Sequence, residues 1–383
     1  MTKQMQATKQ RLHTELCDLA AVRPERAEAF LARLYADDAE WRGSHPLNGI
    51  RGAGAIAGKV WRPLIRSFPD LERRDLIVAG GSHEGRTYVA MVGHYCGTFR
   101  EDWLSIPATG RPIFIRYGEV HELRDGRIVQ SNCLWDILDV IRQAGFRPLP
   151  PSLGTEGMWP GPITGDGLDF NDRNPAQSAA SIAQTLAMHG TLRDYADVEG
   201  RGREGLLTMP QKEHWHPKMM WYGPAGIGTV RGLQGFVDYH QMPFRAAFPR
   251  PATEAEVASV AAARTKMGGG HYIRIGDGPY SVTGGWPSRV DLHSGPNFLG
   301  LPATGRTVGM RVMDFYLHHE GLIRENWVPL DVLDLLMQLG VDVLARMQSH
   351  FRRGAEAASC ERMQYVYPDS RPVTLRWPVS EGS

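Results

Sequence analysis

The sequence has few cysteines for its length, and they lie far apart. Cys17, Cys96, Cys133 and Cys360 are the only four among 383 residues, and no two of them form a CxxC pair. This spacing predicts neither a disulfide framework nor a thiolate zinc site. The chain also lacks a run of 18 apolar residues, and its polar N-terminus lacks the apolar core of a signal peptide. We therefore expect a cytoplasmic protein without a membrane span.

The sequence has no excess of charge of either sign. Lys and Arg total 43 against 42 for Asp and Glu, which gives a formal net charge of +1. Nucleic-acid binding and polybasic membrane surfaces need clustered positive charge, so we expect neither partner. GxSxG and GK[ST] motifs are also missing. The glycine-rich pieces at 223–228 and 268–270 do not stand between a strand and a helix, so they indicate turns and not a dinucleotide site.

An internal repeat is the main organising feature. Residues 107–145 and 302–340 share 13 of 39 positions without a gap, at an offset of 195. A second block aligns at an offset of 180, through Trp41 with Trp221, Arg51-Gly52 with Arg231-Gly232, and Phe68-Pro69 with Phe248-Pro249. The change of offset indicates about 15 extra residues in the second copy, at about 251–270. The repeat predicts two homologous domains.

Composition suggests where these domains end. Residues 147–167 are dense in Pro and Gly and show neither a helical nor an alternating period. We therefore expect a first domain over 1–146, a linker over 147–174 and a second domain over 175–350. A tail over 351–383 would follow, with short strands at 362–368 and 373–378.

Each copy begins with helices and continues with strands. In the first copy, helical spacing of apolar residues occurs at 26–36 and 53–68. Strand-like runs follow at 75–80, 87–99, 112–123 and 127–137, with a closing helix at 137–145. This order predicts an α+β fold in which a curved antiparallel sheet wraps around helices. The resulting cone would have an apolar interior suited to a small molecule.

Three motifs point to a known family. FLGLPATGR at 298–306, HEGLI at 319–323 and DVLDLLMQLG at 331–340 resemble the SnoaL-like polyketide cyclases of the nuclear transport factor two-like (NTF2-like) superfamily, and the first copy carries WLSIPATGR and RDGRI. The resemblance implies two tandem cone-shaped NTF2-like/SnoaL-like domains and cofactor-independent acid–base chemistry on a carbonyl compound. It also implies an intrachain pseudo-dimer, because such domains usually form homodimers, and a further homodimer is plausible.

The sequence departs from the family at one position. The cyclases use an aspartate seven residues after the hairpin glycine, where this chain has Cys133 after Gly126 and Val328 after Gly321. Seven residues before these glycines, where the family often has a polar residue facing the cavity, stand Glu119 and Asp314.

Asp314 is the leading candidate for acid–base chemistry. It lies between Met313 and Phe315 in a strand-like run, where loss of hydration would raise the pKa of its carboxyl group. The alternative for Asp314 is a structural bond to the opening helix or to an arginine. For Glu119 the alternative is a salt bridge to Arg116 or Arg127.

Strand alternation supplies the other candidates. The predicted catalytic residues are Asp314, Glu119, His121, His293, Asn326 and Tyr316. The predicted substrate contacts are Trp41, Trp221, Tyr117, His94, Cys133, Val328 and His318. Core packing is the alternative for the two tryptophans. Asp136, Asp139, Asp331 and Asp334 are expected to cap the closing helices.

His214, His216 and His240 suggest a metal site, but the repeat aligns His216 with Ala36, so we expect no metal. The resemblance to the cyclases implies that no cofactor is needed. The sequence thus favours a cyclase, isomerase or lyase for a small cyclic or aromatic carbonyl compound. The second copy is the preferred active half, since its insertion can form a lid. A non-catalytic binding protein and a hydrolase that holds water between Asn326 and Asp314 remain alternatives.

Overall fold

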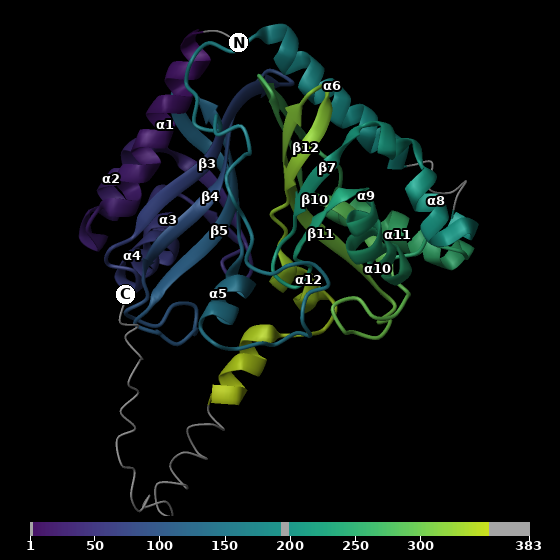
Figure 1. Ribbon diagram of the computed structural model, residues 1–383. Coiled ribbons are helices and arrows are strands. Elements are labelled where there is room, and N and C mark those ends of the chain that lie inside the picture. The colour runs from purple at the N-terminus through teal and green to yellow at the C-terminus, as the bar shows by residue number, and fades with distance from the viewer. Residues whose placement is uncertain (1–2, 193–198, 352–383) are drawn as a thin grey trace, which may run out of the picture.

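The computed structural model describes residues 3–192 and 199–351, and it divides into two halves with matching elements (Figure 1). The first half contains α1 (Lys3–Ala21), η1 (Pro24–Arg26), α2 (Ala27–Leu34), β1 (Tyr35–Gly43), β2 (Gly49–Arg51), α3 (Ala53–Ile56), the π-helical turn η2 (Ala57–Trp61), α4 (Arg62–Ser67), β3 (Glu72–His83), β4 (Arg86–Thr98), β5 (Pro112–Arg124), β6 (Arg127–Trp135) and α5 (Ile137–Gln143).

The second half begins with a longer helical segment and then repeats this order. It contains α6 (Pro175–Thr191), η4 (Glu199–Arg201), α8 (Gly202–Thr208), η5 (Pro210–Glu213), β7 (Trp215–Tyr222), β8 (Thr229–Arg231), α9 (Gly232–Phe236), the π-helical turn η6 (Val237–Gln241), α10 (Met242–Ala247), α11 (Glu254–Met267), β9 (Ile273–Asp277), β10 (Tyr280–His293), β11 (Arg306–His319), β12 (Leu322–Trp327) and α12 (Val332–Gln338). Residues 343–351 are also helical.

Each half folds into one six-stranded sheet, in the orders β2-β1-β6-β5-β4-β3 and β8-β7-β12-β11-β10-β9. The identical orders confirm the predicted α+β architecture of two tandem domains. The expectation of wholly antiparallel sheets is wrong in one respect, because β1 pairs in parallel with β6 and β7 in parallel with β12. The first strand of each sheet follows the opening helices and joins the sheet beside the last strand, which runs in the same direction.

Strand register confirms the alignment of the repeat. In the first sheet, Trp41 pairs with Ser131, and Ser131 pairs with His121. In the second sheet, Trp221 pairs with Asn326, and Asn326 pairs with Tyr316. These positions are related by the offsets of 180 and 195 read from the sequence, so equivalent residues can be compared one by one.

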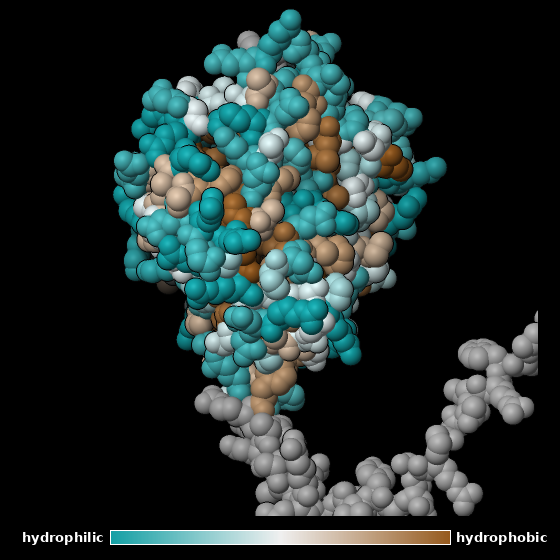
Figure 2. All heavy atoms as spheres, turned by 90° about the vertical axis from the view of Figure 1, so that its left-hand side faces the viewer, coloured by the Kyte–Doolittle hydropathy of each residue, from teal (hydrophilic) through white to brown (hydrophobic). Residues whose placement is uncertain are grey.

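The two sheets lie back to back in the middle of the molecule (Figure 1). The layer between them is a continuous apolar cluster that includes Val92 and Val120 from the first sheet and Val282 and Phe315 from the second. Strand alternation sends the neighbouring residues of these strands to the opposite faces, toward the helices. The outer face of the first domain, which carries α1 and α2, is mainly hydrophilic with smaller apolar groups (Figure 2).

Contacts between the domains are reciprocal. The Asp136 carboxylate accepts a hydrogen bond from the Ala225 backbone N–H at 2.9 Å, and the Asp331 carboxylate accepts one from the His45 backbone N–H at 2.9 Å. Asp136 and Asp331 are equivalent in the repeat, and so are His45 and Ala225. Such exchange of equivalent contacts is the mark of a two-fold symmetric interface. As predicted, Asp136 and Asp331 also cap α5 and α12.

Two segments lie outside the repeated elements. No helix or strand begins between the end of α5 at Gln143 and the start of α6 at Pro175, although Thr155 forms an isolated bridge to Thr229. Within the extra residues of the second copy, α11 begins at a capping box formed by Thr253 and Glu256. The strands predicted at 362–368 and 373–378 lie outside the described residues. Among the helices of the described part, none is long and apolar enough to cross a membrane.

Candidate functional site

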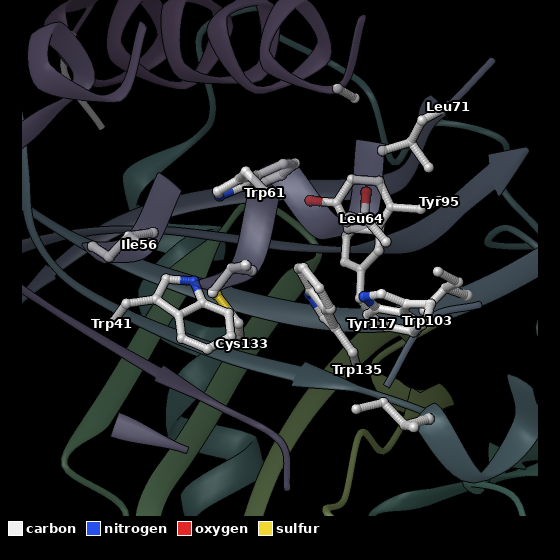
Figure 3. Packing of buried hydrophobic residues seen from close by; sticks show 14 of the residues in the cluster. Trp41, Ile56, Trp61, Leu64, Leu71, Tyr95, Trp103, Tyr117, Cys133 and Trp135 are labelled. Atoms are coloured by element: carbon white, nitrogen blue, oxygen red, sulfur yellow. The ribbon is translucent and has the colours of Figure 1, made fainter. Parts of the chain in front are cut away.

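Aromatic side chains fill the cone of the first domain. Trp61, Tyr95 and Trp135 point toward one another (Figure 3), with ring centroids of Trp61 and Tyr95 at 6.1 and 5.4 Å from that of Trp135. Trp41 packs against Trp135 at 5.8 Å. Cys133 is buried in the same cluster, where burial raises the pKa of its thiol. The predicted contacts Trp41 and Cys133 are therefore core residues of this domain.

A buried ion-pair network occupies the polar centre of this cone. The Arg73 guanidinium donates to Glu119 Oε2 at 2.7 Å and to both carboxylate oxygens of Asp75, at 2.9 and 3.0 Å. Glu119 Oε1 also accepts from Tyr95 and Trp135, at 3.0 and 2.7 Å. Tyr117 donates to Asp75 at 2.6 Å. All four oxygens of the two carboxylates are thus satisfied.

This network keeps Glu119 ionised. Burial opposes the charged form, but the Arg73 charge and hydrogen bonds from His121 and Arg73 outweigh it, so the pKa of Glu119 lies well below its usual range. Its salt-bridge partner is Arg73 and not Arg116 or Arg127, because Arg116 pairs with Asp136. His121 is held by Ser131 at 2.8 Å and lies 3.4 Å from Glu119. We therefore interpret Glu119, His121 and Tyr117 as parts of a structural network and not of the candidate site.

The cone of the second domain is open. A pocket of about 770 Å³ lies between β10–β12 and the helices α6, α9 and α10, and α11 reaches its edge through Arg264. Its volume follows from smaller side chains at equivalent positions. Val312 stands where the first domain has Tyr117, Leu330 where it has Trp135, and Gln241 where it has Trp61. The aromatic side chains that fill the first cone are thus replaced by smaller side chains in the second.

Asp314 lies on the wall of this pocket, and no cation among the described residues pairs with it. It pairs in register with Thr283 on β10, and Thr283 pairs with Arg274 on β9. Asn326 Nδ2 lies 3.4 Å from Asp314 Oδ1. Burial raises the pKa of Asp314 to about 7, against the lowering effect of hydrogen bonds from Asn326 and Tyr316. A carboxyl group with this pKa can both accept and donate a proton near neutral pH.

A histidine on α6 continues the polar chain behind Asp314. His189 Nε2 lies 2.9 Å from the Tyr316 hydroxyl. Burial, with the charges of His271 and Arg274, lowers the pKa of His189 to about 3, so its ring is neutral. If Tyr316 donates its proton to Asp314, His189 must donate to the Tyr316 oxygen, since a hydroxyl has a single proton.

Trp221 forms a flat wall together with His240. The two rings are stacked, with centroids 4.1 Å apart and planes at 21°. The π-helical turn η6 brings His240 and Gln241 to the pocket, and such turns often occur at functional sites. Burial and the charges of Arg245 and Arg289 lower the pKa of His240 to about 3. Val328 and Asn326 on β12 line the same pocket.

Three other candidates do not line this pocket. His318 is tied to α6 by Gln184 and Thr185 and to Ser281, with distances of 2.8 to 3.1 Å. His293 bonds Thr304 at 3.0 Å and packs against Phe248. His94 contacts Trp159 of the linker.

The sequence analysis did not identify His189, and it did not compare the sizes of equivalent side chains in the two cones. His189 lies outside the blocks that align in the repeat, so no equivalent residue drew attention to it. The loss of Tyr117, Trp135 and Trp61 at the equivalent second-copy positions was readable from the alignment, and it indicates which cone is hollow.

The histidines considered as metal ligands do not come together. His216 Nε2 contacts Glu320 at 3.3 Å, whereas His240 lies in the pocket. Within the described residues, His13, Cys17 and Asp75 form the one group with three ligand atoms close enough for a metal. Asp75 is already neutralised by Arg73, and its hydrogen bond to the His13 ring, more than the added interactions with Cys17, raises the pKa of His13 to about 9. A metal ion would have to displace this proton and compete with Arg73 for Asp75, so we propose no metal site here.

The fold and the hollow cone define an α+β protein with two tandem cone-shaped domains. Residues 18–131 match the family model described as the SnoaL-like domain. The first domain is therefore a SnoaL-like domain, and the second repeats its strand order.

Solved structures that match the chain each cover about one domain. IdmH from Streptomyces antibioticus is 21% identical, covers 36% of this chain and 99% of its own, and has a TM-score of 0.31. TsrD from Streptomyces laurentii is 20% identical, with coverages of 36% and 96% and a TM-score of 0.30. An NTF2-like protein from Burkholderia pseudomallei is 15% identical, with coverages of 38% and 100% and a TM-score of 0.27. No curated protein matches the chain.

Proposed function

We propose that the second domain is a cofactor-independent acid–base enzyme of the cyclase, isomerase or lyase type. Its substrate is a small cyclic or aromatic carbonyl compound. The observation that carries this proposal is Asp314, a carboxyl group that faces a pocket, has no cationic partner and has a pKa of about 7. Titratable groups perturbed in this way are typical of catalytic sites.

The neighbours of Asp314 suggest how the reaction proceeds. The ionised carboxylate takes a proton from the carbon next to the substrate carbonyl, and the C–H electron pair forms an enolate. Asn326 and Tyr316 lie beside Asp314 and donate hydrogen bonds to the enolate oxygen. The proton then returns from Asp314 to another carbon in an isomerisation. In a cyclisation, the enolate carbon attacks a second carbonyl group, and Asp314 protonates the new alkoxide.

His189 acts in this proposal as a positioning residue. Its neutral ring holds the Tyr316 hydroxyl at 2.9 Å and fixes the direction in which that hydroxyl donates. The helix α11 lies at the edge of the pocket, where the insertion was expected to form a lid over the bound substrate.

The first domain has a structural role in this proposal. Its filled cone offers no space beside Glu119, while its sheet covers the back of the second sheet. The reciprocal contacts of Asp136 and Asp331 support an intrachain pseudo-dimer. A further homodimer and a cytoplasmic location stay predictions.

One observation favours the alternative of a non-catalytic binding protein. The position where the SnoaL-like cyclases have their acid is occupied by Val328, which gives that part of the pocket wall no proton-transfer group. The hydrolase alternative depends on Asn326 and Asp314, which lie side by side on the pocket wall and could both bind one water molecule from the pocket.

Hydrogen–deuterium exchange tests the proposal without a known substrate. A panel of cyclic and aromatic ketones in D2O is followed by proton NMR, which reports loss of the hydrogens next to the carbonyl. We expect exchange with the wild-type protein and a rate about 100-fold lower with Asp314→Asn, because the amide cannot take the proton. Equal rates for both proteins would overturn the proposal.

Glu119→Gln is the matched control, since it changes the equivalent acid in the filled cone. Its exchange rate per folded molecule, with folding checked by circular dichroism, should equal that of the wild type. Ketones that bind without any exchange would favour the binding protein. Exchange lost in both variants alike would show that the second cone is not the site.

A further inference from the structure

Four arginines line the pocket of the second domain, and they come from four different elements. Arg245 lies on α10, Arg264 on α11, Arg274 on β9 and Arg289 on β10. Among the described residues that line this pocket, Asp314 is the only carboxylate. The described lining of the pocket therefore carries more positive than negative side chains, although the whole chain is nearly neutral.

Two of these arginines have no acidic partner among the described residues. Arg289 pairs with Asp291 at 2.8 Å and lies over the ring of Phe244. In the described ranges, Arg264 and Arg274 form no ion pair. Arg274 donates from Nε to the backbone oxygen of His271 at 2.8 Å, and Arg264 reaches the backbone oxygen of Val290 at 3.5 Å. Both guanidinium groups are exposed at the pocket and keep donors available for an anion.

Burial keeps the histidines of the pocket neutral, and the charges of the same arginines add to this effect. After burial, the largest effects that lower the pKa of His271 to about 4 are the charges of Arg274 and Arg289. Arg274 acts in the same way on His189, and Arg245 and Arg289 act on His240. An environment that disfavours additional positive charge favours a negative group on a bound molecule.

The positions of Arg274 and Asp314 set the size of such a molecule. They stand in one row across three neighbouring strands, with Thr283 between them. Their Cα atoms are therefore about 10 Å apart, which is two strand spacings. Trp215, Trp221 and Phe236 supply apolar and aromatic walls of the same pocket. A flat ring system of one or two rings fits between the two polar ends.

We propose that the pocket binds an aromatic or cyclic carbonyl compound that carries a carboxylate, with Arg264 and Arg274 holding the carboxylate and the carbonyl group turned toward Asp314. Only the orientation of the carbonyl group rests on the proposed function. The preference for a carboxylate rests on the arginines and can be tested by binding alone.

A matched pair of ligands tests this preference. Binding of 2-naphthoate and of its neutral amide, 2-naphthamide, is measured by isothermal titration calorimetry on the full chain. We expect the carboxylate to bind about tenfold more tightly, and the difference to shrink as salt is raised, since the arginines are partly exposed. Equal affinities for the two ligands would overturn the proposal.

Variants then show which arginines are responsible. Arg264→Gln and Arg274→Gln should each reduce the preference for the carboxylate about threefold, and the double variant should abolish it. Neither substitution leaves an acid unpaired, so the fold should be retained. Arg66→Gln, an exposed arginine of the first domain, is the control and should leave the preference unchanged. A preference that persists in the double variant would overturn the assignment to this pocket.

The proton-transfer proposal can be tested separately from the preference for a carboxylate. Exchange of the methyl hydrogens of 4-acetylbenzoate and of 4-acetylbenzamide is compared in D2O. Exchange of both at the same rate, with equal binding, would leave the proposed function standing and overturn the carboxylate inference. Preferential binding of carboxylates without exchange would support the inference and count against proton transfer.

Discussion

Glu119 and Asp314 occupy equivalent positions, 195 residues apart, on the matching strands β5 and β11. The Arg73 guanidinium lies 2.7 Å from Glu119, and the pKa of that carboxyl is far below its usual range. The neutral Asn326 amide lies 3.4 Å from Asp314, and burial raises the pKa of Asp314 to about 7. The two equivalent acids thus lie in different electrostatic environments, and only the environment of Asp314 is suited to proton transfer.

The pKa of Asp314 makes stability depend on pH. Its pKa is about 7 in the folded state against an ordinary value of 3.8, so its contribution to stability is complete below pH 4 and is lost as pH rises through 7. Asp314→Asn resembles the protonated form at every pH. We expect the variant to gain about 1–3 kcal/mol over the wild type in free energy of unfolding between pH 5 and 8.

Urea denaturation at a series of pH values measures this gain. The expected gain is smaller than the whole pKa shift would give, because the carboxyl group lines a pocket where solvent screens its charge. A constant difference between the two proteins across this pH range would show that the pKa of Asp314 is not raised.

Glu119 is expected to contribute in the opposite way. Glu119→Gln removes one carboxylate of a buried ion pair, so we expect a loss of about 3 kcal/mol or more in the free energy of unfolding at pH 7. Its pKa is lowered by folding, so this loss should shrink as pH falls below about 4.5. Urea denaturation at pH 7 and pH 3.5 checks both statements, and an undiminished loss at pH 3.5 would contradict the second.

Tyr316 tunes the pKa of Asp314. Its hydrogen bond lowers that pKa, so Tyr316→Phe should raise the pKa of Asp314 above 7, by up to about one unit. Carbon NMR of protein labelled at the aspartate carboxyl carbon measures the titration. Tyr280→Phe is the control, because Tyr280 is bonded to Asp166 and belongs to the layer between the sheets. A shift of similar size in the control would show that the effect is not local.

The sequence predicted the fold well because the repeat and the strand periods are local signals. The offsets of 180 and 195 correctly paired Trp221, Asn326 and Tyr316. The partner of Glu119 was not predictable in this way. Arg73 reaches it across the sheet from β3, although the two residues are 46 positions apart, whereas Arg116 and Arg127 are near in sequence but point elsewhere. Tertiary distance, and not spacing along the chain, decides which charges meet.

We expect the volume of each cone to depend on the size of the side chains at the equivalent positions compared above. In the double variant Val312→Tyr with Leu330→Trp, the second domain receives the residues that fill the first. We expect the variant to lose binding of 2-naphthoate and proton exchange, because the aromatic side chains occupy the pocket. Its free energy of unfolding should fall by no more than about 1–3 kcal/mol, since the added atoms enter empty space.

The reverse exchange serves as the control. Tyr117→Val with Trp135→Leu opens a cavity in the first domain and removes hydrogen bonds to Asp75 and Glu119. Loss of packing and of these bonds should reduce the free energy of unfolding by about 4 kcal/mol or more. Exchange per folded molecule should stay unchanged, because the second pocket keeps its own side chains. If filling the second cone left binding and exchange intact, the ligand site would have to lie elsewhere on the chain.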